Sequence, residues 1–160
     1  MKQKTLARLI MAAIIGVAVC AAIVYVFIVP AFAEHLGKTA GEEFVYMIKP
    51  WLFFVSGTAL PVAAMLVIAF TIAVNISRDR SFCMENARRL AVISILAAAD
   101  SAYFFIGNVV LLLLGMNHPG IFLFDMLVCF VGLAVTVASG ALSHYTRKAA
   151  ELRADADLTI

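Results

Sequence analysis

Hydrophobic residues are gathered in four long blocks, and charged residues are almost confined to the segments between them. The first two blocks contain no charged residue, the third contains only Asp100 and the fourth only Asp125. A helix needs about 20 apolar residues to cross a hydrocarbon core, so each block is long enough for one span. The pattern predicts an all-α polytopic membrane protein with a bundle of four transmembrane helices. The predicted spans are residues 9–33, 50–77, 90–116 and 120–144.

Composition indicates one membrane domain over residues 1–160, with a short cytoplasmic tail at residues 145–160. The chain is 64% hydrophobic and 14% charged, with a mean hydropathy of +1.04, which lies outside the range of soluble domains. Twelve Lys and Arg nearly balance ten Asp and Glu, so the charge does not indicate direct nucleic-acid binding. The lipid bilayer is the first expected partner.

The first block also has features of a signal peptide. Three basic residues precede it, and Ala31-Phe32-Ala33 at its end matches a small-x-small cleavage pattern. The hydrophobic region of a signal peptide is about 7–15 residues long, whereas the uncharged run here has 25 residues. We therefore interpret the block as a transmembrane helix.

The distribution of Lys and Arg among the loops predicts the topology. Ten of the twelve precede the first block, lie between the second and third, or follow the fourth, and two lie between the first and second. By the positive-inside rule, both termini and residues 78–89 face the cytoplasm, which predicts a multi-pass membrane protein with both ends on the cytoplasmic side. Aromatic residues at the block ends agree with this orientation: Phe44, Tyr46 and Trp51 on the outer side and Tyr145 on the inner side.

Small residues at four-residue spacing predict where the helices approach closely, because association in lipid depends on such contacts. Pro61 lacks an N–H group for the carbonyl of Gly57 and predicts a kink in the second span. A small-residue ridge can also join two copies of the chain, so a homo-oligomer stays open. The ridges are Ala12, Gly16 and Cys20 on the first span, and Gly132, Thr136 and Gly140 on the fourth.

Asp100 is the most informative polar residue. It lies ten residues beyond Leu90, about 15 Å into the membrane, where a charged Asp costs about 2.5–3.5 kcal/mol. No Lys or Arg lies at this depth, and Thr136 and Ser139 are nearest in height. We therefore expect a protonated acid that is hydrogen-bonded to these hydroxyls. Two roles fit Asp100 equally. It either makes a polar contact that holds helices together, or it binds a ligand or a proton.

Asp125 lies five residues into the fourth span, about 8 Å from its outer end. The free-energy cost of its charge in the membrane is therefore smaller than that of Asp100. We favour a role in orienting the hairpin of the last two spans. The alternative is a polar path from the outer face to the membrane centre, formed by Asp125, Asn108 and Asp100.

Motifs of enzymes and metal sites are missing from the sequence. It has no Walker loop, nucleophile elbow or His-Glu-x-x-His pair, and the acidic stretch of Glu34, His35, Glu42 and Glu43 matches no metal motif. The three cysteines form no Cys-x-x-Cys pair. We expect a protein that is not an enzyme and has no catalytic residue, no metal and no cofactor.

Two stretches carry a resemblance to a known family. One is Phe82-Cys83-Met84-Glu85-Asn86-Ala87-Arg88-Arg89-Leu90, and the other is Ala150-Glu151-Leu152-Arg153-Ala154-Asp155-Ala156-Asp157-Leu158-Thr159-Ile160. Both resemble domain of unknown function 2975, a group of bacterial four-span membrane proteins. Members are often encoded beside small helix-turn-helix regulators, so the resemblance implies a sensory or regulatory role with such a regulator as partner. It supplies no catalytic residues.

The leading functional hypothesis is a non-enzymatic sensor or regulatory subunit that detects a lipophilic ligand or membrane state and signals to a cytoplasmic partner. The alternative is a small proton- or cation-linked transporter or channel-like subunit that uses Asp100 and Asp125. Candidates for a ligand or proton site are Asp100, Asn108, Asp125, Thr136 and Ser139. Candidates for contact with a cytoplasmic partner are Arg78, Arg80, Arg88, Arg89 and Arg153.

Overall fold

The computed structural model describes residues 3–39, 45–117 and 119–157, and the regular elements in these ranges are all helices. Four helical segments are long and apolar enough to cross a membrane, so the predicted all-α four-span architecture is confirmed. Glu42, Glu43 and the last three residues lie outside the described ranges. The elements are α1 (Gln3–Ile23), η1 (Val24–Ile28), α2 (Val29–Thr39), α3 (Val45–Gly57), α4 (Ala59–Ser77), α5 (Met84–Leu113) and α6 (Pro119–Asp157).

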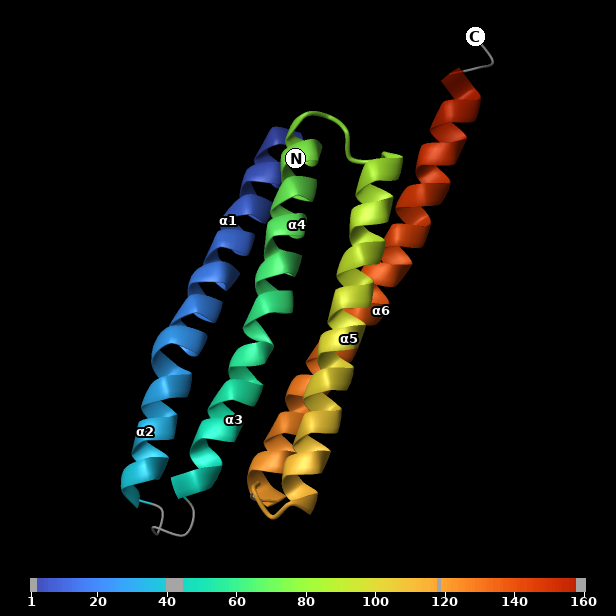
Figure 1. Cartoon of the computed structure of the whole chain (residues 1–160). Helices are drawn as coiled ribbons and strands as arrows, with labels where there is room; N and C mark the ends of the chain where they lie inside the picture. The colour runs from blue at the N-terminus through green and yellow to red at the C-terminus, as the bar shows by residue number, and fades with distance from the viewer. Residues whose placement is uncertain (1–2, 40–44, 118, 158–160) are drawn as a thin grey trace.

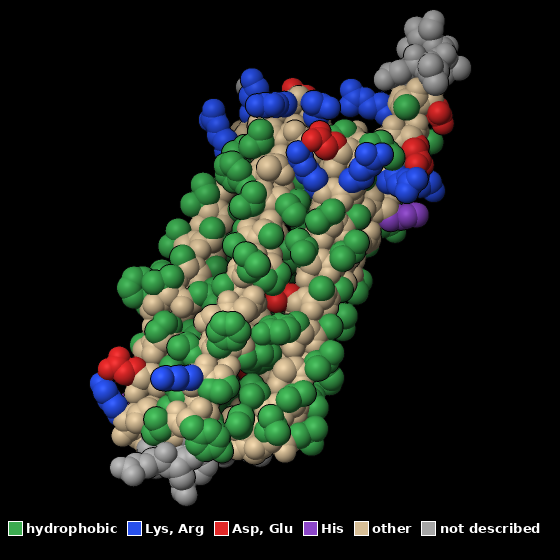
Figure 2. Space-filling view, viewed as in Figure 1, with side chains coloured by type: hydrophobic (Ala, Val, Ile, Leu, Met, Phe, Trp, Pro, Cys, Tyr) green, Lys and Arg blue, Asp and Glu red, His purple; other side chains and the backbone are tan. Residues whose placement is uncertain are grey.

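The spans form two pairs. The helix made by α1, η1 and α2 lies beside the one made by α3 and α4, while α5 and α6 form a hairpin, and α4 also contacts α5 (Figure 1). Both termini lie at one end of the bundle, together with the α4–α5 loop (Figure 1). Lys and Arg side chains gather there (Figure 2), and we call it the basic end, defined by the first turn of α1, residues 78–89 and residues 147–153.

The α5–α6 hairpin begins with a glycine turn. Gly115 has a φ of +71°, and the Met116 N–H bonds the Leu111 carbonyl at 2.8 Å while the Gly115 N–H bonds Leu112 at 3.0 Å. This is the arrangement in which a left-handed residue, most often glycine, ends a helix. The returning helix α6 has 39 residues, about 58 Å at 1.5 Å per residue, and runs beyond the other helices at the basic end (Figure 1).

The predicted small-residue ridge on the fourth span packs against α5. A Cβ on Gly132 would overlap the Ser101 side chain, and one on Gly140 would lie 3.1 Å from Ser94 Oγ. The close approach lets serine hydroxyls cross between the helices: Ser94 donates to the Thr136 carbonyl at 2.8 Å, and Ser143 on α6 donates to the Ala87 carbonyl at 2.7 Å.

The predicted ridge on the first span is wrong as a contact within the chain. Ala12, Gly16 and Cys20 are exposed, and nothing in the described residues lies within 4 Å of a Cβ placed on Gly16. The span instead turns a different set of small residues toward the second span, including the buried Ala7 and the half-buried Ala18. Small size permits a helix contact but does not decide which face makes it.

The second span is interrupted just before Pro61, where the sequence predicts a kink: α3 ends at Gly57 and α4 begins at Ala59. Near the break, the Thr58 N–H bonds the Val55 carbonyl at 3.2 Å, which leaves the Phe54 carbonyl without its usual helical donor. Tyr103 of α5 donates its hydroxyl to that carbonyl at 3.2 Å. Gly57 leaves room for this hydroxyl, since a Cβ there would lie 2.9 Å from it.

The first span has a matching irregularity. Pro30 has no N–H group, and the turn before it widens into the π-helix η1, whose last bond joins the Val29 N–H to the Val24 carbonyl. Tyr25 of η1 hydrogen-bonds Thr58 at 2.6 Å, so the two irregular segments lie side by side.

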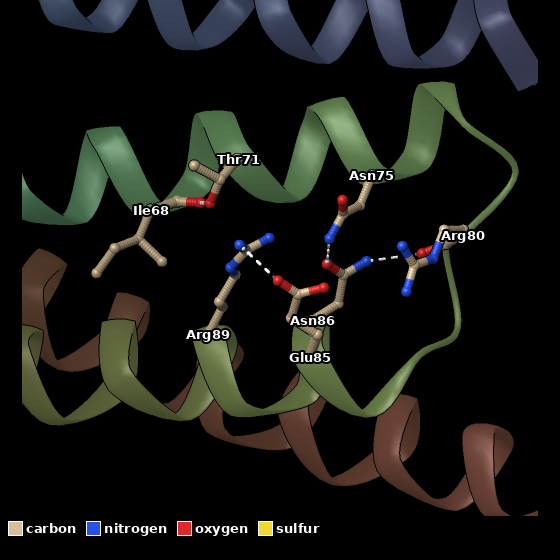
Figure 3. A network of polar contacts seen from close by, with 7 residues as sticks. All are labelled: Ile68, Thr71, Asn75, Arg80, Glu85, Asn86 and Arg89. Atoms are coloured by element: carbon tan, nitrogen blue, oxygen red, sulfur yellow. Dashed lines mark hydrogen bonds and ion pairs between the residues drawn. The ribbon is translucent and has the colours of Figure 1, made fainter.

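Asn86 fastens the α4–α5 loop (Figure 3). Its amide oxygen accepts from Asn75 Nδ2 at 2.8 Å, and its amide nitrogen donates to the carbonyls of Arg80 and Ser81, both at 3.0 Å. Only 1% of Asn86 is exposed. One buried side chain therefore joins the end of α4, the loop and the start of α5.

Replacing Gly107 by Ala should destabilise the bundle. The Phe54 ring covers Gly107, stacked on Phe104 at 5.6 Å between ring centres, so an added Cβ would overlap it. We expect the free energy of unfolding to fall by about 1–3 kcal/mol relative to Gly16→Ala. Both substitutions share the gain in helix propensity. The difference between their free energies of unfolding in mixed micelles therefore measures the cost of the overlap between the new Cβ and the Phe54 ring. Equal stabilities would show that Phe54 does not pack on Gly107.

Asn86→Ala should also lower stability, because it leaves the Asn75 amide and two loop carbonyls without their partner. The expected cost is about 1–3 kcal/mol for each buried group left unpaired, reduced where water reaches the loop. Arg80→Ala is the control, since it keeps the carbonyl that Asn86 bonds. Hydrogen exchange of the loop amides measures both variants, and unchanged exchange in Asn86→Ala would contradict the role of this residue as a fastener.

Candidate functional site

A cavity of about 410 Å³ lies between the spans, and all four of them contribute to its wall. Its size falls within the range of about 300–1,000 Å³ typical of ligand pockets. Most of the wall is Val, Ala, Met and aromatic side chains. The hydroxyl and carboxyl groups that reach it belong to Tyr25, Thr58, Asp100, Ser101 and Asp125.

The cavity extends from the hairpin end of the bundle, where Trp51 and Asp125 line it, to the middle of the spans. Asp100 is close to the middle of α5, and an acidic side chain is visible within the apolar belt of the surface (Figure 2). Both irregular segments reach the same wall, through Tyr25 of η1 and Thr58 at the break between α3 and α4. Broken helices and π-helical turns in membrane proteins often adjoin binding sites.

The hydrogen bond between Tyr25 and Thr58 has a defined direction. Thr58 donates its hydroxyl hydrogen to the Val55 carbonyl at 2.8 Å. The Thr58 oxygen must therefore accept the bond from Tyr25, because a threonine hydroxyl has one hydrogen. The Tyr25 oxygen is left as an acceptor on the cavity wall.

Asp100 does not bond the hydroxyls expected from its depth. Thr136 donates its hydroxyl to the Gly132 carbonyl of its own helix at 2.9 Å, a common arrangement for Thr within helices. Neither Thr136 nor Ser139 lines the cavity. Asp100 instead lies near Tyr25, and within the described residues its carboxyl group has no hydrogen-bonding partner.

Asp125 is tied to the end of the hairpin. Asn117 hydrogen-bonds its carboxyl group and also donates to Asn108 Oδ1 at 3.0 Å. Asn108 is fully buried and donates to the Phe104 carbonyl at 2.9 Å. These bonds support the hairpin-orienting role of Asp125.

The structure thus unites some of the predicted site residues and separates others. Asp100 and Asp125 line one cavity, whereas Asn108 contacts Asn117 and does not line it. Among the described residues, Asn117 links Asn108 to Asp125, whereas no hydrogen bond joins Asn108 to Asp100.

The sequence did not single out Tyr25, Thr58 or Ser101 as cavity residues. A signal was available for the first two, because each lies shortly before an intramembrane proline: Tyr25 five residues before Pro30, and Thr58 three residues before Pro61. Proline leaves backbone groups to be satisfied by neighbours, and polar side chains nearby serve that need.

The basic candidates are divided between two places. Arg78, Arg80 and Arg88 are exposed around the α4–α5 loop, while Arg89 forms an ion pair with Glu85 at 2.7 Å and points toward α4 (Figure 3). Arg153 is exposed on the part of α6 that extends beyond the bundle (Figure 1). In the described ranges, no group of three His, Cys, Asp and Glu side chains is placed to hold a metal ion.

Searches of curated proteins and of solved structures found no match to the chain. A sequence profile described as "Protein of unknown function (DUF2975)" matches residues 36–160. The matched region includes the last three spans, Asp100, Asp125 and both stretches that carry the resemblance, and it excludes most of the first span. The chain therefore belongs to the DUF2975 family, whose function is unknown.

Proposed function

We propose that the protein is a non-enzymatic membrane sensor or regulatory subunit that binds a lipophilic ligand between its spans and signals to a cytoplasmic partner. The observation that carries this proposal is the cavity. Its walls are mostly apolar, with a few hydroxyl and carboxyl groups, and this combination is typical of sites for small ligands.

The proposed location is the bacterial cytoplasmic membrane, with the basic end facing the cytoplasm. Two features support this orientation: eight of the twelve Lys and Arg residues lie in the segments that define the basic end (Figure 2), and α1 begins and α6 ends there (Figure 1). The extended part of α6 then projects into the cytoplasm.

The arrangement of the two helix pairs supports a route for the signal. Each pair contributes residues to the cavity wall, and the α4–α5 loop joins the pairs at the basic end. A ligand that changes the separation of the pairs would move α1 and α4 relative to the α5–α6 hairpin, which carries Arg88 and Arg153. The proposed receiver is a helix-turn-helix regulator, the partner implied by the family resemblance. The exposed ridge of α1 offers a contact face for a homo-oligomer.

Filling the cavity should abolish ligand binding. Val62 lines the cavity, whereas Val67 on the same helix is 65% exposed and faces away from the core. We expect Val62→Trp to reduce the lipophilic molecules that copurify from native membranes by at least about tenfold, which corresponds to 1.4 kcal/mol, and Val67→Trp to retain them. Native mass spectrometry measures the bound molecules. Equal retention by both variants would contradict a ligand site in this cavity.

Capture of the partner uses the same two variants. After crosslinking in native membranes, a cytoplasmic protein should copurify with the wild type and with Val67→Trp, in an amount that Val62→Trp changes several-fold. Repeated recovery of no cytoplasmic protein would count against the regulatory role.

Transport is the second candidate, and the presence of Asp100 and Asp125 on one cavity favours it. In this case, protein in liposomes should move protons or cations, and Asp100→Asn should stop the flux while the protein stays folded. Liposomes without flux would support the sensor. Since four spans form a narrow pathway only with difficulty, a transporter would need a homo-oligomer.

A further inference from the structure

We propose that the ligand is an amphiphilic cation, with its ammonium group bound by the acidic side of the cavity wall, to which Asp100 and Asp125 belong, and its apolar tail in the rest of the cavity. This inference rests on the proposed function of the cavity as a ligand site. It adds the chemical class of the ligand.

The charges of the wall favour a cation. Asp100 and Asp125 both line the cavity, and none of the described residues that line it is Lys, Arg or His. A carboxylate inside a membrane is costly unless it is paired, so a bound cation would supply a counter-charge that the wall does not provide. An anionic ligand would add a third negative group to the same space.

The hydrogen-bonding groups of the cavity wall also favour a cation. Because Tyr25 donates its proton to Thr58, its oxygen faces the cavity only as an acceptor. The Asp100 carboxyl group also has no donor among the described residues. A ligand that brings N–H donors or a positive charge fits these acceptors.

The aromatic lining adds a third reason. Trp51, Phe104 and Phe124 line the cavity together with Tyr25. Ring faces attract alkylammonium groups, and aromatic side chains are a common means of binding quaternary ammonium ligands. Exchange of the Asp100 proton, which leaves to water, for a permanently charged ammonium conserves the net charge of the site.

Trp51 makes the inference directly measurable. It is the only tryptophan in the chain, so intrinsic tryptophan emission reports on the cavity. Three ω-bromoundecyl probes with a trimethylammonium, an alcohol or a sulfate head group share one quenching bromine and one tail. Phosphatidylcholine liposomes contain no other tryptophan and have no net charge. Partitioning of each probe into protein-free liposomes is measured separately, so half-saturation is compared at equal probe concentration in the lipid, and partitioning alone gives a non-saturating background.

We expect the ammonium probe to quench Trp51 saturably, with half-saturation at a concentration at least about tenfold lower than that of the alcohol and lower still than that of the sulfate. Asp100→Asn and Asp125→Asn should each raise the half-saturation of the ammonium probe about tenfold and leave that of the alcohol unchanged. Glu85→Gln, which removes an acid at the basic end, should change neither.

The outcomes separate this inference from the proposed function. Saturable quenching at equal concentrations by ammonium and alcohol would overturn the cationic ligand and leave the cavity as a site for neutral lipophilic molecules. The absence of saturable quenching by all three probes would overturn both. The comparison of head groups uses the wild-type protein, so it decides the question even if a variant fails to fold.

Discussion

The fold depends on one constraint: within lipid, backbone N–H and C=O groups must find their partners inside the protein. Pro30 and Pro61 interrupt the regular backbone hydrogen bonds of the first two spans. The π-helix η1 lies just before Pro30, and the break between α3 and α4 lies just before Pro61. Tyr103 bonds the carbonyl that the break releases. Tyr25 and Thr58 meet where the two irregular segments face each other. The cavity adjoins this meeting point, so its height in the membrane follows from the positions of the two prolines.

The helix contacts divide the bundle into a close hairpin and a more open boundary. Between α5 and α6, glycines let serine hydroxyls reach carbonyls of the opposite helix. Between the two helix pairs, a buried asparagine cluster closes the basic end, and the cavity occupies the space nearer the middle. Packed helices resist deformation, whereas a boundary with a cavity can change its width at lower cost. The cavity therefore lies at the less closely packed boundary between the two pairs.

The sequence predicted the features that depend on depth along the membrane normal, and it failed on those that depend on rotation about a helix axis. Charges are excluded from lipid, so the four spans followed from the charge pattern. Pro61 marked the break in the second span. The face that each helix turns inward is set by packing. Gly16 therefore faces away from the core although its spacing resembles that of Gly132. Thr136 matched Asp100 in height, yet its hydroxyl bonds its own helix. Tyr25 was missed because one aromatic residue within an apolar block is also typical of a lipid-facing position.

The distribution of polar groups over the helix pairs bears on how binding could become a signal. Asp100 and Asp125 belong to the α5–α6 hairpin, whereas Tyr25 and Thr58 belong to the first two spans. A ligand shifts a conformational equilibrium only by its difference in affinity for the two states. A molecule that contacts one pair alone would bind equally at any separation and transmit nothing. A molecule that places its charge on the acids and its remaining contacts on the opposite wall binds one separation best. Because Asn86 fixes the loop to both α4 and α5, the change would reach the basic end as a movement of whole helices and not as a rearrangement of the loop.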